Sequence, residues 1–321
     1  MKTIRLISCV ALSAAVAFGV AACGGDGSSS DTSGSSGDSK LSGAIKIDGS
    51  STVFPFAQAA AEEFQRENPN VNISVGESGT GGGFEKFCAG ETDISNASRP
   101  IDAEKEVPAC KSKDVKYSGV QVANDGIAIV TNKDLKIDCM TTEQLKTLWS
   151  AKSKVDNYKQ LDPEFPDQKV ALFGAGTDSG TFDFFTEEIN GASGDTRKDY
   201  SPTEDDNITV QGVSGDKGGL GYFGFSYYED NVDKLNLVQV DDQSGCVAPS
   251  KETIQDGTYE PLSRPLFMYA STAALARPEV KAFLDYALAN QSTIADASKI
   301  VPLTVEQLSK AKNGLTTAEG K

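Results

Sequence analysis

Three segments of this sequence place a short apolar run before a loop rich in Gly, Ser and Thr, with a helical pattern after it. In the clearest one, residues 169–173 resemble a strand, and residues 174–181 read Gly-Ala-Gly-Thr-Asp-Ser-Gly-Thr. Phe182, Phe185 and Ile189 then share one helix face. The other two loops are residues 48–53 and 77–83. Strands that alternate with helices predict an α/β fold whose ligands bind beyond the carboxyl ends of the strands.

The third loop brings Ser179, Gly180 and Thr181 to the start of a helix. Backbone N–H groups there have no intrahelical partner and carry the positive end of the helix dipole, so they favour an anion. Ser and Thr at a helix start also act as ordinary caps, and this alternative stays open for a single loop. Three loops of the same kind, with an Arg99 turn after a fourth strand, favour a shared anion site.

The N-terminal residues have the pattern of an export signal. Lys2 and Arg5 precede an apolar stretch, and Val20-Ala21-Ala22-Cys23 resembles a bacterial lipobox, in which the cysteine is lipidated. We therefore expect a signal over residues 1–22 and a flexible Gly/Ser-rich tether over residues 23–43. Ordinary cleavage nearby, with Cys23 unmodified, is the alternative. The remaining body of about 280 residues is long enough for two lobes with cores of their own.

The formal net charge is −16, and loss of the signal removes two more positive charges. Such acidity argues against nucleic acid or an anionic membrane surface as a partner, but local backbone dipoles still permit a small anion. The chain has no histidine, which removes the usual general base, the usual zinc ligand and every Ser–His or Cys–His arrangement. We expect neither a cofactor nor a metal.

Four cysteines remain in the exported body, which predicts two disulfides among three connectivities. The short loop favours Cys88–Cys110, and this leaves Cys139–Cys246. A zinc site made of the four thiolates is the alternative, although no spacing between them has the CxxC form.

Patterning also predicts the elements along the chain. Strands are expected at 44–47, 71–75, 93–97, 126–130, 208–210, 219–225, 235–240 and 266–269. Helices are expected from Phe54 to Pro69, at 84–88, 141–149 and 278–290.

Four segments in order resemble the PstS family of phosphate-binding proteins, the solute receptors of ABC-type phosphate importers. They are residues 48–55, 78–83, 97–100 and 176–181, and Gly218-Gly219-Leu220-Gly221-Tyr222 adds to them. The resemblance implies a type II periplasmic-binding-protein-like α/β fold, with the ligand cleft between two lobes joined by a two-stranded hinge. It implies a first lobe of residues 44–123 plus 241–315, a second lobe of 124–240, and crossovers near 122–126 and 235–241.

By position, the resemblance also implies the phosphate ligands. They are Ser51, Thr52 and Val53 from the first loop, Ser78, Thr80 and Gly81 from the second, Arg99 from the turn, and Asp178, Ser179, Gly180 and Thr181 from the second lobe. Many members have an aspartate where this chain has Arg99, and an arginine where it has Ala175. Here the basic group is Arg99 and the acidic one is Asp178, which could accept the proton of hydrogen phosphate or could cap the helix.

The expected function is that of an extracytoplasmic receptor, lipid-anchored to the outer face of the cell membrane and monomeric. It would bind inorganic phosphate and deliver it to the permease subunits of an ABC importer. The alternatives are the same fold serving sulfate or molybdate, a tethered adhesion protein, and an aspartic-protease-like enzyme. The last needs two Asp-[Ser/Thr]-Gly motifs, and Asp178 has the only one. We therefore expect no enzyme.

Overall fold

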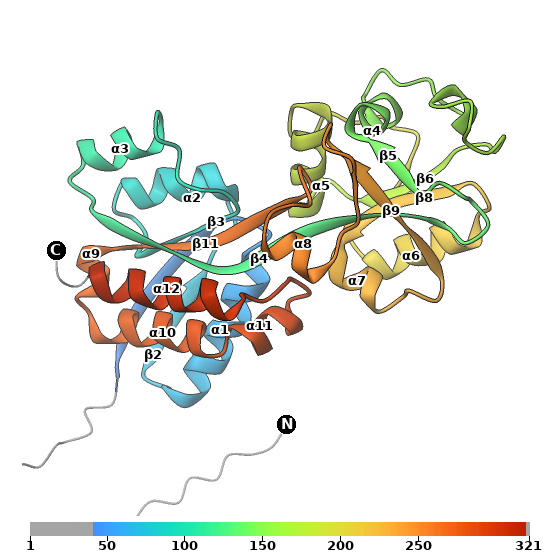
Figure 1. Ribbon diagram of the computed structural model, residues 1–321. Coiled ribbons are helices and arrows are strands. Elements are labelled where there is room, and N and C mark those ends of the chain that lie inside the picture. Colours follow the sequence, from blue (N-terminus) through green and yellow to red (C-terminus); the bar gives the residue numbers. More distant parts are fainter. Residues whose placement is uncertain (1–40, 319–321) are drawn as a thin grey trace, which may run out of the picture. The chain divides into compact units, whose positions relative to one another are not determined.

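The computed structural model describes residues 41–318, which fold as a mixed α/β protein (Figure 1). Its strands are β1 (Gly43–Gly49), β2 (Val71–Val75), β3 (Ile94–Ala97), β4 (Tyr117–Asn132), β5 (Cys139–Thr141), β6 (Ala171–Ala175), β7 (Ser201–Thr203), β8 (Gly219–Gly224), β9 (Leu235–Asp241), β10 (Cys246–Val247) and β11 (Ser263–Ser271).

Its α-helices are α1 (Phe54–Glu67), α2 (Gly79–Cys88), α3 (Glu106–Ser112), α4 (Thr142–Trp149), α5 (Gly180–Phe185), α6 (Asp206–Gly215), α7 (Phe225–Glu229), α8 (Lys251–Gln255), α9 (Thr272–Leu275), α10 (Pro278–Ala289), α11 (Gln291–Ala297) and α12 (Val305–Ala318). A 3₁₀ turn, η1, covers Tyr158–Gln160, and a single π-helical turn, η2 (Thr186–Asn190), continues α5.

The strands follow the order β2-β1-β3-β11-β4-β8-β6-β7, and β9 branches off to pair with β4, β5 and β10. Pairing is parallel between β1 and its neighbours β2 and β3, and between β6 and its neighbours β7 and β8. The long strand β4 pairs antiparallel with β11 through residues 117–126 and with β8 and β9 from residue 127 onward. One strand therefore runs through both halves of the protein.

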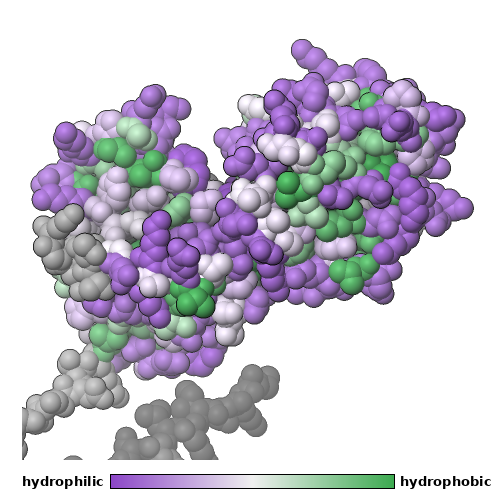
Figure 2. Space-filling model, in the orientation of Figure 1, coloured by the Kyte–Doolittle hydropathy of each residue, from purple (hydrophilic) through white to green (hydrophobic). Residues whose placement is uncertain are grey.

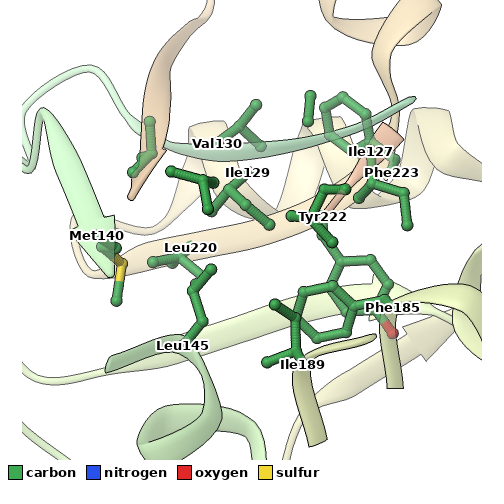
Figure 3. Packing of buried hydrophobic residues seen from close by; sticks show 14 of the residues in the cluster. Ile127, Ile129, Val130, Met140, Leu145, Phe185, Ile189, Leu220, Tyr222 and Phe223 are labelled. Atoms are coloured by element: carbon green, nitrogen blue, oxygen red, sulfur yellow. The ribbon is translucent and has the colours of Figure 1, made fainter. Parts of the chain in front are cut away.

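The two larger of the three hydrophobic clusters in the described residues define the two lobes. The first lobe packs α1, α10, α11 and α12 on its sheet, and its core includes Phe56, Phe64 and Phe283. The second lobe packs α4, α5 and α6 around β4, β6 and β8 (Figure 3). In its core, Tyr222 and Phe185 stack with their ring centroids 3.9 Å apart. Burial of such large rings stabilises each lobe on its own.

Two strands, β4 and β11, carry the chain between the cores, and Val301, between Ile300 and Leu303 of the first core, also packs in the second. The crossing on β4 falls between Ala123 in the first core and Ile127 in the second, and the resemblance implied one near residues 122–126. The second prediction, near residues 235–241, is wrong. Residues 241–262 still pack with the second lobe, whose core includes Leu262, and the first core resumes at Leu266. Burial of side chains from 254–262 holds that stretch against the second core, which patterning of β9 alone did not reveal.

Residues 208–210 form part of a helix, not the predicted strand. Their β-branched side chains suggested a strand, but Asp205 caps α6 by accepting the Asn207 N–H, and Thr209, Val210 and Val213 form its buried face. Tertiary packing has outweighed the local propensity. The glycine-rich second loop likewise begins helix α2 at Gly79, earlier than the predicted residue 84.

Both predicted disulfides are confirmed. Cys88–Cys110 joins α2 to α3, and Cys139–Cys246 joins β5 to β10 on either side of β9. The four thiols are thereby used, and the zinc alternative is excluded. Between residues 41 and 318, no group of three or more metal-ligating side chains is gathered.

Hydrophilic residues dominate the face drawn in Figure 2, with hydrophobic residues in scattered spots, as the acidic composition leads one to expect. No helix within the described range has the length and apolarity to cross a membrane. The predicted signal and Cys23, and all but the end of the predicted tether, lie outside the described residues.

Candidate functional site

The first loop presents unpaired backbone donors at the start of α1. The Phe54 N–H donates to the Ser50 carbonyl at 3.0 Å, which closes the first turn. Within residues 41–318, no hydrogen bond is recorded for the backbone N–H groups of Ser51, Thr52 and Val53. The Val53 side chain is fully buried in the first core, so only its backbone can serve a ligand. These three N–H groups form a site with the polarity that an anion requires.

A cavity of about 540 Å³ opens beside this loop and is lined from both lobes. It brings together six of the predicted ligands: Ser51, Thr52, Thr80, Gly81, Arg99 and Gly180. A second cavity of about 400 Å³ shares Ser51, Thr52 and Gly180 with the first and adds Asp178, Ser179 and Thr181. The predicted loops therefore converge, and the meeting point is the contact between Thr52 and Gly180.

That contact requires a residue without a side chain at position 180. A Cβ there would lie 2.5 Å from the Thr52 Oγ1 and 2.9 Å from the Thr52 nitrogen, with the Ser51 hydroxyl equally close. Because no real Cβ fits at such distances, only glycine lets the second lobe approach the first loop so closely.

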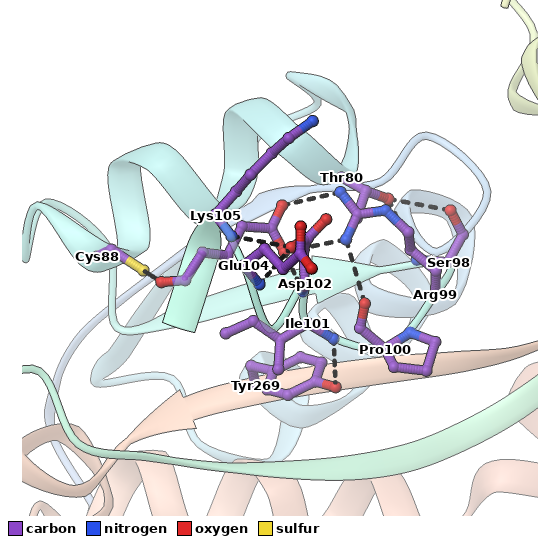
Figure 4. A network of polar contacts seen from close by, with 11 residues as sticks. Thr80, Cys88, Ser98, Arg99, Pro100, Ile101, Asp102, Glu104, Lys105 and Tyr269 are labelled. Carbon is purple, nitrogen blue, oxygen red and sulfur yellow. Dashed lines mark hydrogen bonds and ion pairs between the residues drawn. The ribbon is translucent and has the colours of Figure 1, made fainter. Parts of the chain in front are cut away.

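Ser78 lies apart from both cavities. It is exposed, and its hydroxyl donates to Asp48, which also forms an ion pair with Lys86 at 2.7 Å. Thr80, the second residue of α2, lines the cavity, and its hydroxyl contacts the Ser98 hydroxyl at 3.0 Å and accepts the Ser98 N–H at 3.2 Å (Figure 4). The second loop thus reaches the cavity through Thr80 and Gly81, and its Ser78 remains a prediction.

Arg99 already has a carboxylate partner (Figure 4). Its Nη1 and Nη2 donate to the two oxygens of Glu106 at 2.9 and 2.8 Å, and Nη1 also donates to the Pro100 carbonyl at 3.1 Å. The Glu106 contact raises the pKa of Arg99. The side chain is 44% exposed and lines the cavity, so the cation is held in place while remaining open to a ligand.

Asp178 does not cap the following helix. The cap is Ser179, whose Oγ accepts the Thr181 N–H at 3.2 Å. Asp178 is exposed in the second cavity, where its own N–H donates to Glu204 at 3.3 Å. The capping alternative for Asp178 therefore has no support in the geometry, and its carboxylate stays free to act on a ligand.

Carboxylates predominate in the second cavity. Asp206 lines it, and burial raises the pKa of Asp206 to about 7, against a backbone hydrogen bond from Gly224 that lowers it. Lys299, also in the lining, is paired with Asp230 at 2.6 Å. In the first cavity, burial and the neighbouring Glu187 raise the pKa of Glu188. The acidic surroundings make the few cations at the meeting point the decisive groups for any anion.

Sequence reasoning missed one of those cations, Arg264. Its Nε donates to Asp125 Oδ2 at 3.1 Å, and its Nη2 donates to Thr52 Oγ1 at 2.6 Å. Burial lowers the pKa of Arg264, and the adjacent Asp125 counters that shift. A signal existed in the sequence, because Ser-Arg-Pro occurs at 98–100 and again at 263–265.

This architecture, two α/β lobes with a polar site where their loops meet, defines a solute-binding protein. The model of the PBP superfamily domain matches residues 34–291. The chain belongs to that superfamily and, within it, to the PstS family of phosphate-binding proteins.

Relatives and solved structures agree with this assignment. Protein SphX of Synechococcus elongatus is 46% identical over 267 residues, which cover 82% of this chain and 79% of that protein. The phosphate-binding protein PstS of Staphylococcus saprophyticus is 40% identical, with 85% of each chain covered. A crystal structure described as a possible phosphate-binding protein from Planctomyces limnophilus superposes with a TM-score of 0.81 at 44% identity, over 87% of this chain and 99% of that one.

Proposed function

We propose that this protein is an extracytoplasmic receptor that binds inorganic phosphate between its lobes and delivers it to an ABC-type phosphate importer. The observation that carries the proposal is the convergence in adjoining cavities of Ser51 and Thr52 with their unpaired N–H groups, the hydroxyl groups of Thr80 and Thr181, and two arginines. Backbone donors and guanidinium groups are the partners that a phosphate dianion prefers. The site holds no nucleophile–base arrangement, and we propose no enzymatic activity.

Four ligand segments are proposed. They are Ser51, Thr52 and Val53 at the start of α1; Ser78, Thr80 and Gly81 at α2; Arg99; and Asp178, Ser179, Gly180 and Thr181 from the second lobe. Three of the four belong to the first lobe and the fourth to the second, and they meet at the contact between Thr52 and Gly180. An anion held by all of them would require both lobes, which is the geometry expected of a receptor that closes on its ligand.

Isothermal titration calorimetry of the purified protein with phosphate, sulfate and molybdate tests this proposal. We expect one phosphate per chain and much weaker binding of the other two anions. Tighter binding of sulfate or molybdate would assign the same fold to another oxyanion, and no binding of any of the three would overturn the proposal.

We further propose that the protein is a monomer whose membrane contact is a lipid on Cys23, with the permease subunits of the importer as its protein partners. The relatives named PstS and the lipobox-like Val20-Ala21-Ala22-Cys23 support this. The anchor is tested by fractionating cells that express the wild type and a Cys23→Ser variant.

A further inference from the structure

Arg264 occupies an unusual place, because it lies on one of the two strands that connect the lobes. It falls between Leu262 of the second core and Leu266 of the first. Directly opposite it in the sheet is Asp125 of β4, which lies between Ala123 of the first core and Ile127 of the second. The ion pair Arg264–Asp125 therefore joins the two connecting strands to each other at the crossover.

From this position the guanidinium reaches both lobes. Nη2 donates to Thr52 Oγ1 of the first lobe at 2.6 Å and to the Gly180 carbonyl of the second at 3.3 Å. The group also lies over the ring of Phe184 in α5, 3.7 Å from its centroid. Within the described residues Nη1 has no recorded hydrogen bond, although Arg264 lines the larger cavity. Nη1 is thus available to an anion.

Asp125 determines how the guanidinium is turned. Its Oδ2 accepts from Nε at 3.1 Å, and both side chains are nearly buried, with 12% of Arg264 and 7% of Asp125 exposed. An arginine whose Nε is fixed in this way presents its two Nη groups in one direction, here toward Thr52 and the cavity.

Resting on the proposed function, we propose that Arg264 is a second anion-binding cation of the site and couples anion binding to closure of the lobes, with Asp125 as its positioning residue. An anion bound to Nη1 and to the N–H groups at the start of α1 would hold the connecting strands and both lobes through a single guanidinium, whose Nη2 already donates to the Gly180 carbonyl. Loss of Arg264 would then affect affinity and closure together.

Arg99 offers a matched comparison within the same cavity. It belongs to the first lobe, and its hydrogen-bond partners, Glu106 and Pro100, are also in the first lobe. It can attract an anion but cannot transmit that contact to the second lobe. Arg197 offers a remote control: it is nearly buried in the second lobe, where it pairs with Asp199 at 2.7 Å.

The experiment compares Arg264→Gln, Arg264→Lys, Arg99→Gln and Arg197→Gln with the wild type. Calorimetry measures phosphate affinity, and small-angle X-ray scattering measures the decrease in radius of gyration at saturating phosphate. Thermal unfolding establishes that each variant folds. If Arg264→Gln does not fold, Arg264→Lys takes its place in the comparison, because lysine keeps the charge and most of the aliphatic stem.

We expect Arg264→Gln to weaken phosphate binding about 30-fold and to close incompletely at saturation. Arg264→Lys should lie between it and the wild type, because lysine keeps the charge but cannot bond Asp125 and the ligand together. Arg99→Gln should bind weakly yet close fully, and Arg197→Gln should bind normally. Affinity within twofold of the wild type in Arg264→Gln, or full closure despite weak binding, would overturn the inference. Failure of the wild type to bind phosphate would instead refute the proposed function.

A double-mutant cycle tests Asp125. Asp125→Asn should weaken binding about fivefold in the wild-type background, although it removes a negative charge from an anion site. In the Arg264→Gln background the same substitution should have no such effect, because Asp125 acts through Arg264. Tighter binding, unchanged binding, or an equal effect in both backgrounds would show that Asp125 does not position Arg264.

Discussion

Replacing Arg99 by alanine should weaken phosphate binding by about 2–4 kcal/mol, which is roughly a 30- to 1,000-fold rise in Kd. The guanidinium lines the cavity between the lobes, and a charge-assisted contact to a bound anion costs this much when it is truncated. Isothermal titration calorimetry of wild type and Arg99→Ala gives the two dissociation constants directly. A Kd within twofold of the wild type would refute the assignment of Arg99 as a ligand.

The ion pair between Arg99 and Glu106 makes a second variant necessary in this titration. Glu106 accepts hydrogen bonds from both Nη groups of Arg99, so Arg99→Ala also leaves the Glu106 carboxylate without its cation. Part of the loss could then be repulsion between Glu106 and the anion. In the double variant Arg99→Ala/Glu106→Gln that charge is absent. If the double variant still binds weakly, the guanidinium itself contacted phosphate; recovery of wild-type affinity would mean that Arg99 only neutralised Glu106.

The remaining predictions concern specificity, stability and anchoring. Asp178→Asn should narrow the preference for phosphate over sulfate by about tenfold, roughly 1.4 kcal/mol, because sulfate has no proton to donate; an unchanged ratio in competition titrations would exclude Asp178 as the discriminating group. Replacing Cys139 and Cys246 together should lower the free energy of unfolding by about 5 kcal/mol in urea titrations, and replacing Cys88 and Cys110 together should lower it by about 3 kcal/mol. The difference arises because the first disulfide closes the longer loop, with a sequence separation of 107 against 22. Equal losses would contradict this entropic explanation. The pKa of Asp206 is raised to about 7 from its ordinary value of 3.8, so the folded state holds a proton that the unfolded state lacks between those values. Stability should therefore fall as pH rises from about 4 to 7, and urea titrations of Asp206→Asn across that range should lack this component. Cys23→Ser should move the protein from the membrane fraction to the soluble fraction, and retention in the membrane would disprove the lipid anchor.

The candidate ligand loops could be identified from sequence because their chemistry is local. Glycine and hydroxyl residues between a strand and a helix have the same consequence wherever they occur, so the loops before α1 and α5 were recognisable, as was their resemblance to PstS proteins. The second loop was recognised too, although α2 begins within it, at Gly79. The disulfides followed from a count of cysteines and from the ease of closing a short loop. Residues 208–210 were mistaken for a strand, because β-branched side chains have the same local preference whether or not a core buries them on a helix face.

What only the tertiary structure decided is how charges distant in sequence meet. Asp125 and Arg264 are 139 positions apart and become neighbours through the pairing of β4 with β11, which nothing in their own surroundings specifies. The second crossover likewise lies at residues 262–266, because burial against the second core holds residues 241–262 in the second lobe. Local sequence therefore determined which loops carry the pattern of an anion site. The long-range pairing of β4 and β11 determined which arginine lies between those loops, because only the folded sheet brings residues so distant in sequence together.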